Sequence, residues 1–288
     1  MPFTLTRYRT VDEFLAAAGG YLAEREAEHN LIFGICSAIR ANPETPGEAP
    51  SFAAVTDDAG RVSAAALRTP PWNVVLSEVD TPEATDLLAD DWAAHDPDLR
   101  GVTGPKAAAG RFSKQWTRRT GRTARIELEE RIFRLARVIP PRPTPGSWRL
   151  AADRDRQILA DWFVAFVEEA APESPRPDDL DAAVDRWIRR IGRTMYLWED
   201  GDRVVSLVGA GGETPNGIRI GPVYTPPELR RRGYASALTA AASQDQLDAG
   251  RRFCFLFTDL ANPTSNKIYQ AIGYEPVGDV DQYLFETA

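Results

Sequence analysis

The segment 223–236 constrains the fold more than any other part of the chain. It reads VYTPPELRRRGYAS, in which a short apolar stretch runs into two prolines, three consecutive arginines and a glycine. An alanine-rich stretch follows from about Tyr234 to Ala249, and Gly250 is a suitable stop for a helix there. The pattern predicts a strand, a tight loop and a long helix. This connection points a helix N-terminus and flanking positive charge at one place.

The loop between the predicted strand and helix is typical of an anion site. The first N–H groups of a helix have no partner within the helix, and the helix dipole adds partial positive charge there. A phosphate group satisfies both. Gly233 lets the backbone approach the anion closely or adopt a positive φ, and Pro226 and Pro227 end the strand. The arginine run also fits a solvated surface loop or an RNA contact, but the flanking strand and helix favour a phosphate-bearing ligand.

Two common nucleotide-binding loops are excluded. A P-loop requires G-x-x-x-x-G-K-[ST], a dinucleotide fold requires G-x-G-x-x-G between strand and helix, and neither occurs here. The glycine cluster 209–212 is followed by Thr214-Pro215-Asn216-Gly217 and then by a strand-like segment, so no helix begins there. We interpret the cluster as a turn between two strands.

The remaining pattern is Arg230-x-x-Gly233-x-Ala235 after a strand. It resembles the R/Q-x-x-G-x-G/A motif of the GNAT acyltransferase superfamily, which binds acetyl-coenzyme A. The resemblance covers residues 147–288, because a second motif of the family follows in the expected order and spacing.

The second motif lies at residues 262–274, after a buried strand predicted at 253–258. It resembles the family's asparagine after the fifth strand, its short helix with a tyrosine, and its glycine followed by an aromatic residue. Asn262 is a suitable N-cap for the helix, and Pro263 suits the first helical position.

The resemblance implies how the cosubstrate is held. The backbone of residues 223–225 would pair with the pantetheine arm, as a ligand adding to a strand, and one N–H of this strand would polarise the thioester carbonyl. The loop would hold the pyrophosphate, mainly through backbone N–H groups. The residues implied in binding are Val223, Tyr224, Thr225, Arg230, Arg231, Arg232, Gly233, Tyr234, Ala235, Ser236, Asn262 and Asn266.

The resemblance also implies that Tyr269 donates a proton or a hydrogen bond to the departing thiolate. A tyrosine with a pKa near 10 is protonated when a thiolate with a pKa of about 8.5 forms; by spacing alone Tyr269 would be a core aromatic residue. The general base is open, because both histidines lie in the first half of the chain. Glu213 and Asp259 are candidates, and each also fits a solvated turn carboxylate.

The first half repeats the predicted order of elements. Strands are expected at 3–8, 52–55, 62–67, 73–76 and 102–103, a helical pair over 11–40 broken near Gly19-Gly20, helices at 82–95 and 106–120, and a strand or strand pair at 127–138. The segment 77–83 replaces the arginines and glycine with carboxylates, which would repel a pyrophosphate. We predict a degenerate copy that does not bind coenzyme A and either forms part of the acceptor pocket or only stabilises the second half.

The predicted architecture is α/β (α+β), with two tandem GNAT-like domains, each a mixed, mostly antiparallel twisted sheet flanked by helices. The first spans residues 1–139, a proline-rich linker spans 140–146, and the acetyl-CoA-binding domain spans 147–288. In the second domain we expect strands at 148–150, 194–198, 204–208 and 218–223, and a final strand pair ending near Phe285. Helices are expected at 153–169 and 180–191, separated by a loop at 172–177.

Composition sets the outer bounds. The chain has 288 residues, of which 43% are hydrophobic and 26% charged, as in globular proteins. It has no apolar run of the ~20 residues that span a membrane, and its N-terminus lacks a signal peptide's apolar region. Cys36 and Cys254 are expected to be buried free thiols, which favours a cytoplasmic location. The net charge of −8 argues against nucleic-acid binding and mildly favours a cationic substrate.

These observations together predict an acetyl-CoA-dependent N-acetyltransferase that acts on a primary amine of a small molecule or peptide by direct attack on the thioester. A longer acyl-CoA or an acyl carrier protein is the alternative donor, and a non-catalytic acyl-CoA sensor is the alternative class. Retention of Tyr269 and Asn262 weighs against the sensor. No metal is implied, and a monomer or homodimer is expected.

Overall fold

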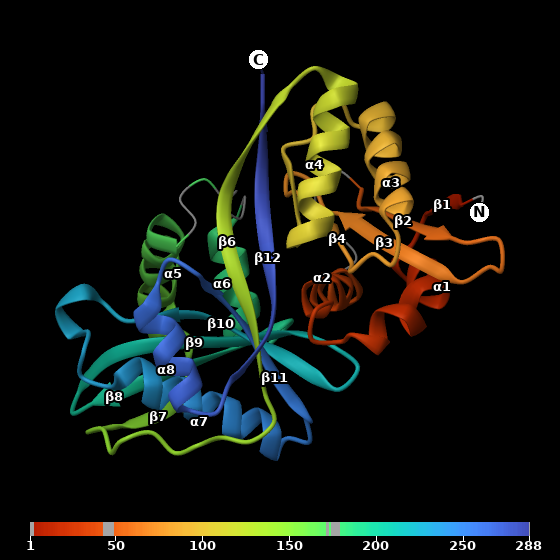
Figure 1. Cartoon of the computed structure of the whole chain (residues 1–288). Helices are drawn as coiled ribbons and strands as arrows, with labels where there is room; N and C mark the ends of the chain where they lie inside the picture. Colours follow the sequence, from red (N-terminus) through yellow and green to blue (C-terminus); the bar gives the residue numbers. More distant parts are fainter. Residues whose placement is uncertain (1–2, 43–48, 171–172, 174–178, 288) are drawn as a thin grey trace. The chain divides into compact units, whose positions relative to one another are not determined.

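The structure, a computed structural model, describes residues 3–42, 49–170, 173 and 179–287 (Figure 1). The chain divides into two compact units. Unit 1 comprises Met1–Ile132, Asp259–Ala261 and Val277–Ala288, and unit 2 comprises Phe133–Thr258 and Asn262–Pro276. The expected loop at 172–177 lies outside the described residues except for Glu173.

Unit 1 contains a sheet with the strand order β1-β2-β3-β4-β5-β12-β6. The pairs β1–β2, β2–β3, β3–β4 and β5–β12 are antiparallel, and the pair β4–β5 is parallel. The strands are β1 (Thr4–Tyr8), β2 (Ser51–Thr56), β3 (Val62–Arg68), β4 (Val74–Leu76), β5 (Gly101–Pro105), β6 (Thr123–Leu135) and β12 (Glu275–Glu286). The helices are α1 (Val11–Glu24), α2 (Asn30–Ala41), α3 (Pro82–His95) and α4 (Lys106–Thr120).

Both faces of the unit 1 sheet are covered. Alternate residues of β2 and β3 face opposite sides, as the pleat of a strand requires. One set packs with α3 and α4, which lie side by side in Figure 1, and the other set packs with α1 and α2. Most of these strand residues are alanine or valine, so the helices approach the sheet closely.

The helical pair at the start of unit 1 is broken elsewhere than the sequence predicted. Gly19 and Gly20 lie inside α1, and the break falls between Glu24 and Asn30. Glycine costs about 1 kcal/mol relative to alanine inside a helix. The buried face of Val11, Phe14, Ala18 and Leu22 outweighs that cost, and a capping box at Thr10 and Glu13 fixes the first turn.

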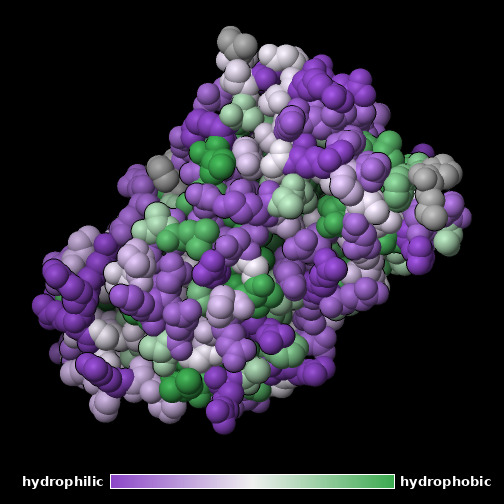
Figure 2. All heavy atoms as spheres, in the orientation of Figure 1, coloured by the Kyte–Doolittle hydropathy of each residue, from purple (hydrophilic) through white to green (hydrophobic). Residues whose placement is uncertain are grey.

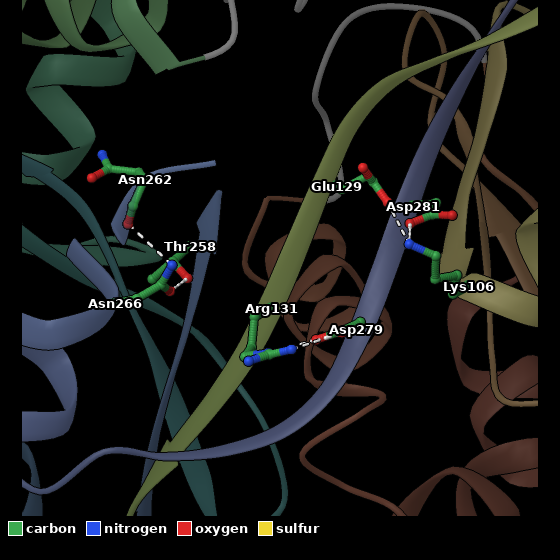
Figure 3. A network of polar contacts seen from close by, with 8 residues as sticks. All are labelled: Lys106, Glu129, Arg131, Thr258, Asn262, Asn266, Asp279 and Asp281. Atoms are coloured by element: carbon green, nitrogen blue, oxygen red, sulfur yellow. Dashed lines mark hydrogen bonds and ion pairs between the residues drawn. The ribbon is translucent and has the colours of Figure 1, made fainter. Parts of the chain in front are cut away.

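The C-terminal strand β12 belongs to unit 1 from Val277 onward, and it pairs antiparallel with β5. Two groups of ion pairs hold it there (Figure 3). Arg131 on β6 pairs with Asp279 at 2.7 Å, and Lys106 pairs with Glu129 and lies 3.5 Å from the buried Asp281. Burial raises the pKa of Asp281, and the Lys106 charge opposes that effect. Both β6 and β12 are single continuous strands, so the strand pair predicted at the end of the chain is wrong.

Unit 2 contains the strand order β11-β10-β9-β8-β7. The strands are β7 (Ser147–Leu150), β8 (Arg193–Asp200), β9 (Arg203–Glu213), β10 (Gly217–Tyr224) and β11 (Phe253–Asp259). The helices are α5 (Arg156–Ala170), α6 (Leu180–Ile188), α7 (Tyr234–Asp248) and α8 (Pro263–Ala271), with short 3₁₀ turns at Asp153–Asp155 and Pro227–Leu229. The strands pair antiparallel except for the parallel pair β10 and β11, which confirms the predicted fold class.

The two faces of the unit 2 sheet carry different helices. Tyr196 and Trp198 of β8 belong to the core beneath α7, whereas Met195 and Leu197 belong to the core beneath α5 and α6. We call the second side the α5/α6 face.

The sequence predicted a turn at the glycine cluster 209–212, but these residues are part of strand β9. A Cβ atom on Gly209 would lie 2.6 Å from the carbonyl oxygen of Gly221, and one on Gly211 would lie 2.6 Å from that of Gly192. These glycines therefore permit close backbone approach within the sheet. The turn between β9 and β10 follows the cluster, at residues 214–217, where the Thr214 hydroxyl accepts a hydrogen bond from the Gly217 N–H.

The surface of the described residues is mainly polar, with apolar side chains interspersed in Figure 2. The large exposed apolar residues Trp72, Ile126, Ile139, Trp148 and Ile191 are distant in sequence. Both cysteines are buried free thiols, as predicted, and burial raises the pKa of each to about 12. None of the described helices combines the length and apolarity needed to cross a membrane.

Candidate acyl-donor site

The N-terminus of α7 carries no side-chain cap. Its N-cap is Gly233, with φ +89°, and the first intrahelical bond runs from the Ala237 N–H to the Gly233 carbonyl at 2.9 Å. The preceding N–H groups of the first turn therefore have no helical acceptor. Because glycine offers no capping oxygen, these donors and the helix dipole are available to an anion.

The loop before α7 holds two positive φ angles, at Arg231 (+64°) and Gly233 (+89°). A Cβ on Gly233 would lie 2.8 Å from Oγ1 of Thr144, in the proline-rich segment, so glycine is required by both conformation and space. A positive φ at arginine costs roughly 1–2 kcal/mol. Strain of this kind is concentrated at ligand-binding loops.

Arg230 braces the loop. Its Nε donates to the Thr225 carbonyl at 2.9 Å, and its Nη2 contacts Oε2 of Glu169, in the last turn of α5, at 2.6 Å. The guanidinium also lies 6.0 Å from the centre of the Tyr224 ring. The bond to Glu169 raises the pKa of Arg230. Arg231 and Arg232 are exposed beside it.

The strands β10 and β11 part in front of this loop. Their parallel ladder consists of the pairs Gly217–Phe253, Ile218–Cys254 and Arg219–Phe255 and ends there. The remaining part of β10, to Tyr224, stays paired with β9 on its other side. One backbone edge of β10 is thus open to a ligand that adds as a strand.

The end of β10 is held from two sides. The hydroxyl of Ser206 donates to the Tyr224 carbonyl at 3.1 Å and lies 2.9 Å from the Thr225 hydroxyl. The Tyr224 ring packs against Trp162 of α5, with 5.9 Å between ring centres. The predicted pantetheine-binding segment is therefore held by contacts with both β9 and α5.

Tyr269 lies on α8, half buried against the core of unit 2, with its ring edge toward Tyr274 at 6.0 Å. Burial raises the pKa of Tyr269 to about 12. Its hydroxyl has no hydrogen-bond partner within the described part of the chain. Tyr269 is therefore protonated at neutral pH, and its hydroxyl is free to donate to a ligand.

The two asparagines of the second motif have different environments (Figure 3). Asn262 caps α8 by accepting a hydrogen bond from the Ser265 N–H at 3.1 Å. Asn266 accepts from the Thr258 hydroxyl and donates to the Asn262 carbonyl at 3.0 Å, which ties α8 to β11. The side chain of Asn262 points away from Asn266 in Figure 3, so its amide group is the more available of the two.

The two candidate general bases, Glu213 and Asp259, belong to different units. Glu213 ends β9 beside the start of β10, where it pairs with Ile218, and its carboxylate forms an ion pair with Arg251. From Ile218 to Val223 the strand advances five residues, or about 16 Å, so Glu213 lies at the far end of β10. Asp259 belongs to unit 1, where its carboxylate accepts the Ala261 N–H at 2.7 Å.

In the equivalent loop of unit 1, several backbone N–H groups already donate to other residues of the unit. In chain order, β4, α3, β5 and α4 correspond to β10, α7, β11 and α8. After β4, the Glu78 N–H donates to Nε2 of His29 at 2.9 Å and the Asp80 N–H donates to the Ser63 carbonyl. Pro82, at the start of α3, has no N–H at all. These bonds give a physical reason for the prediction that this half does not bind coenzyme A.

The tyrosine position also differs between the two units. Tyr269 is the seventh residue of α8, and the seventh residue of α4 is Phe112, which has no hydroxyl. Phe112 is fully buried in the core of unit 1.

Three features of the donor loop were missed by sequence reasoning: the Glu169 partner of Arg230, the Thr144 contact with Gly233, and the His29 bond in unit 1. Each joins residues at least 49 positions apart. No local pattern marks such pairs.

Part of the chain matches a known protein family. Residues 157–274 match the family model described as the acetyltransferase (GNAT) family. No curated protein matches the chain significantly.

Several solved structures share the fold over nearly the whole chain. They include a Drosophila protein (12% identity, 98% of both chains, TM-score 0.68) and a GCN5-related N-acetyltransferase from Sphaerobacter thermophilus (15% identity, 99% of this chain and 95% of that chain, TM-score 0.58). A tandem GNAT protein from the clavulanic acid biosynthesis pathway is also similar (13% identity, 99% of this chain and 98% of that chain, TM-score 0.55). At these identities the likeness concerns the fold alone. Residues 157–274 therefore form a domain of the acetyltransferase (GNAT) family of acyltransferases, and the chain has the fold of a tandem GNAT protein.

Proposed function

We propose that the protein is an acetyl-CoA-dependent N-acetyltransferase that acetylates a primary amine of a small molecule or peptide. One observation carries the proposal: the β10–β11 ladder ends at Arg219 and Phe255, and β10 then continues without β11 to the loop that leads into the uncapped N-terminus of α7. A thioester arm that pairs with β10 would place its pyrophosphate at α7 and its sulfur near the helix that carries Tyr269.

The reaction follows from this placement. The neutral amine attacks the thioester carbon, a C–N bond forms, and the developing oxyanion accepts a hydrogen bond from a backbone N–H of β10. The C–S bond then breaks, and the thiolate accepts a hydrogen bond from the Tyr269 hydroxyl. The amine loses one proton to solvent, and the thiolate gains one.

The proton on the amine limits the reaction at neutral pH. A lysine-type amine has a pKa of about 10.4, so only about 1 in 10³ molecules is neutral at pH 7. Glu213 is poorly placed to remove that proton because it is paired with Arg251 at the other end of β10. The rate is therefore expected to rise about tenfold per pH unit between pH 7 and 9, following the fraction of neutral amine.

The donor is proposed to be a coenzyme A thioester rather than an acyl carrier protein. Coenzyme A presents a pyrophosphate, which suits several backbone donors and the adjacent Arg231 and Arg232. A carrier-bound pantetheine presents a single phosphodiester that is covered by protein.

Titration calorimetry with acetyl-CoA tests the loop. Gly233→Ala is expected to weaken binding by at least about tenfold, because the positive φ and the Thr144 contact both resist a Cβ. Gly250→Ala is the matched control, since Gly250 has φ +96° at the other end of α7 with nothing within 4 Å. Equal affinity of the two variants would remove the loop from the site.

Thiol release with a panel of amines and acyl-CoA chain lengths tests the activity. Turnover with acetyl-CoA and at least one amine is expected. Tight acetyl-CoA binding without turnover of any amine would favour a sensor, and preference for a longer chain would change the donor while keeping the chemistry.

A further inference from the structure

One arginine of unit 2 carries a charge that the protein leaves unpaired. Arg193 is the first residue of β8 and pairs with Gly211 of β9, and Gly211 in turn pairs with Arg219 of β10. The two arginines thus lie in one row of the sheet, separated by a residue without a side chain. Side chains two residues apart in a strand face the same side of the sheet. Arg193 therefore faces the same side as Met195 and Leu197 of β8, and the row lies on the α5/α6 face.

No carboxylate among the described residues pairs with Arg193. Its guanidinium lies 5.8 Å from the centre of the Trp187 ring, at the end of α6. It makes no ion pair or hydrogen bond with any residue that the structure describes. Burial and, to a smaller extent, the like charge of Arg219 together lower its pKa to about 10. Arg219 has interactions of its own, so the unpaired charge in the row is that of Arg193.

The chain has a formal charge of −8, and two other half-buried arginines of unit 2, Arg149 and Arg251, have carboxylate partners. Arg149, for example, contacts Asp155 at 2.6 Å and Glu199 at 2.7 Å. A partly buried charge without a partner is destabilising. A ligand that supplies the missing negative charge would remove that cost.

The row also lies where an acceptor would enter. Arg219 belongs to the last pair of the β10–β11 ladder, so it marks the point at which the two strands part. The proposed donor occupies the side of α7, and the amine must reach the thioester from the opposite, α5/α6 face. From Arg219 to Val223 the strand advances four residues, or about 13 Å.

We propose that Arg193, together with Arg219, binds an anionic group on the acceptor. The inference rests on the proposed function and specifies its substrate class: a small amine with a carboxylate or phosphate within about 13 Å of the nitrogen. A guanidinium holds either group with two parallel hydrogen bonds.

The test uses pairs of amines that differ only in the anionic group, and it measures both binding and turnover. Phenylalanine is compared with 2-phenylethylamine for the carboxylate, and phosphoethanolamine with ethanolamine for the phosphate. In at least one pair, the anionic member is expected to have the higher kcat/KM and to bind more tightly to the protein saturated with coenzyme A.

Arg193→Gln is expected to raise the KM of the preferred anionic amine about 10- to 100-fold, the range for loss of a charged hydrogen bond. The KM values of its uncharged partner and of acetyl-CoA should not change. Arg193→Lys should recover part of the affinity. The melting temperature of Arg193→Gln should stay equal or rise, whereas a structural arginine would lower it. Arg189→Gln is the matched control, because Arg189 is exposed four residues earlier.

The outcomes separate the two proposals. If wild-type protein prefers no anionic amine in binding or turnover, or if Arg193→Gln affects both members of a pair equally, the acceptor site is refuted while the acetyltransferase stands. Binding of an anionic amine that depends on Arg193, without turnover of any amine, would refute the acetyltransferase and keep the site.

Discussion

Replacement of Tyr269 by phenylalanine separates catalysis from stability in unit 2. The Tyr269 hydroxyl has no partner within the described residues, and the pKa of Tyr269 is about 12. A thiol has a pKa of about 8.5, so full proton transfer from Tyr269 to the thiolate would be uphill by about 3.5 pKa units, or about 5 kcal/mol. In the proposed reaction, Tyr269 would therefore act by donating a hydrogen bond to a charged sulfur, which contributes about 1.5–3 kcal/mol.

This free energy sets the expected effect. Tyr269→Phe should lower kcat about 10- to 100-fold, since 1.4 kcal/mol corresponds to a factor of ten. The Kd of acetyl-CoA should change less than twofold, because the loop at α7 is untouched. The melting temperature should not fall, because no hydrogen bond within the protein is lost. Steady-state kinetics, calorimetry and thermal unfolding measure the three quantities.

Tyr274→Phe is the matched control. The Tyr274 hydroxyl lies 2.8 Å from Oγ of the buried Ser243, which itself donates to the Thr239 carbonyl. Loss of the Tyr274 hydroxyl leaves a buried acceptor unsatisfied and should cost about 1–3 kcal/mol of stability, with kcat within about twofold. A kcat for Tyr269→Phe equal to that of wild type, with chemistry shown to limit the rate, would refute the assigned role.

Three further predictions concern stability and the donor loop. Burial lowers the pKa of His29, so the unfolded state binds more protons than the folded state. Urea melts should therefore show unit 1 losing stability as pH falls below about 6.5. His29→Gln should flatten this dependence, and an unchanged slope would contradict the prediction. Gly20→Ala should raise the free energy of unfolding by about 0.5–1 kcal/mol, because a Cβ there meets nothing within 4 Å. Gly211→Ala should lower the free energy of unfolding, because a Cβ there would lie 2.6 Å from the Gly192 carbonyl oxygen. Equal effects of the two variants would show that the β9 contacts are misassigned. Glu169→Gln should change stability by less than about 1 kcal/mol and weaken acetyl-CoA binding several-fold in calorimetry, because Arg230 loses its brace; unchanged affinity would show that the brace is dispensable.

Several elements could be predicted from sequence because local chemistry decides them. The helices α3 and α4 have the predicted bounds, Pro82–His95 and Lys106–Thr120. The cap at Asn262 is confirmed, because an N-cap and the proline after it interact only with their own turn. The loop before α7 belongs to the same class, since its glycine permits a positive φ and its prolines restrict φ wherever the chain lies.

The glycines show where local reasoning fails. The cluster at 209–212 has the composition of a turn, but the glycines are needed because neighbouring backbone atoms approach them closely. Gly19 and Gly20 have the composition of a helix break, but the apolar face of α1 keeps them helical. In both places contacts with distant residues decide between two locally acceptable conformations.

The sequence alone determined the strand, arginine loop and helix over 218–248, their order relative to the second motif, and the absence of the arginines and glycine from segment 77–83 of the first half. All three depend on the backbone preferences and charges of contiguous residues. Only the tertiary structure decided that Arg230 is braced by Glu169, that β12 joins unit 1, and that Arg193 and Arg219 share a row on the α5/α6 face. These features depend on strand register and on pairs of residues far apart in sequence, which the chain defines only when the sheets form.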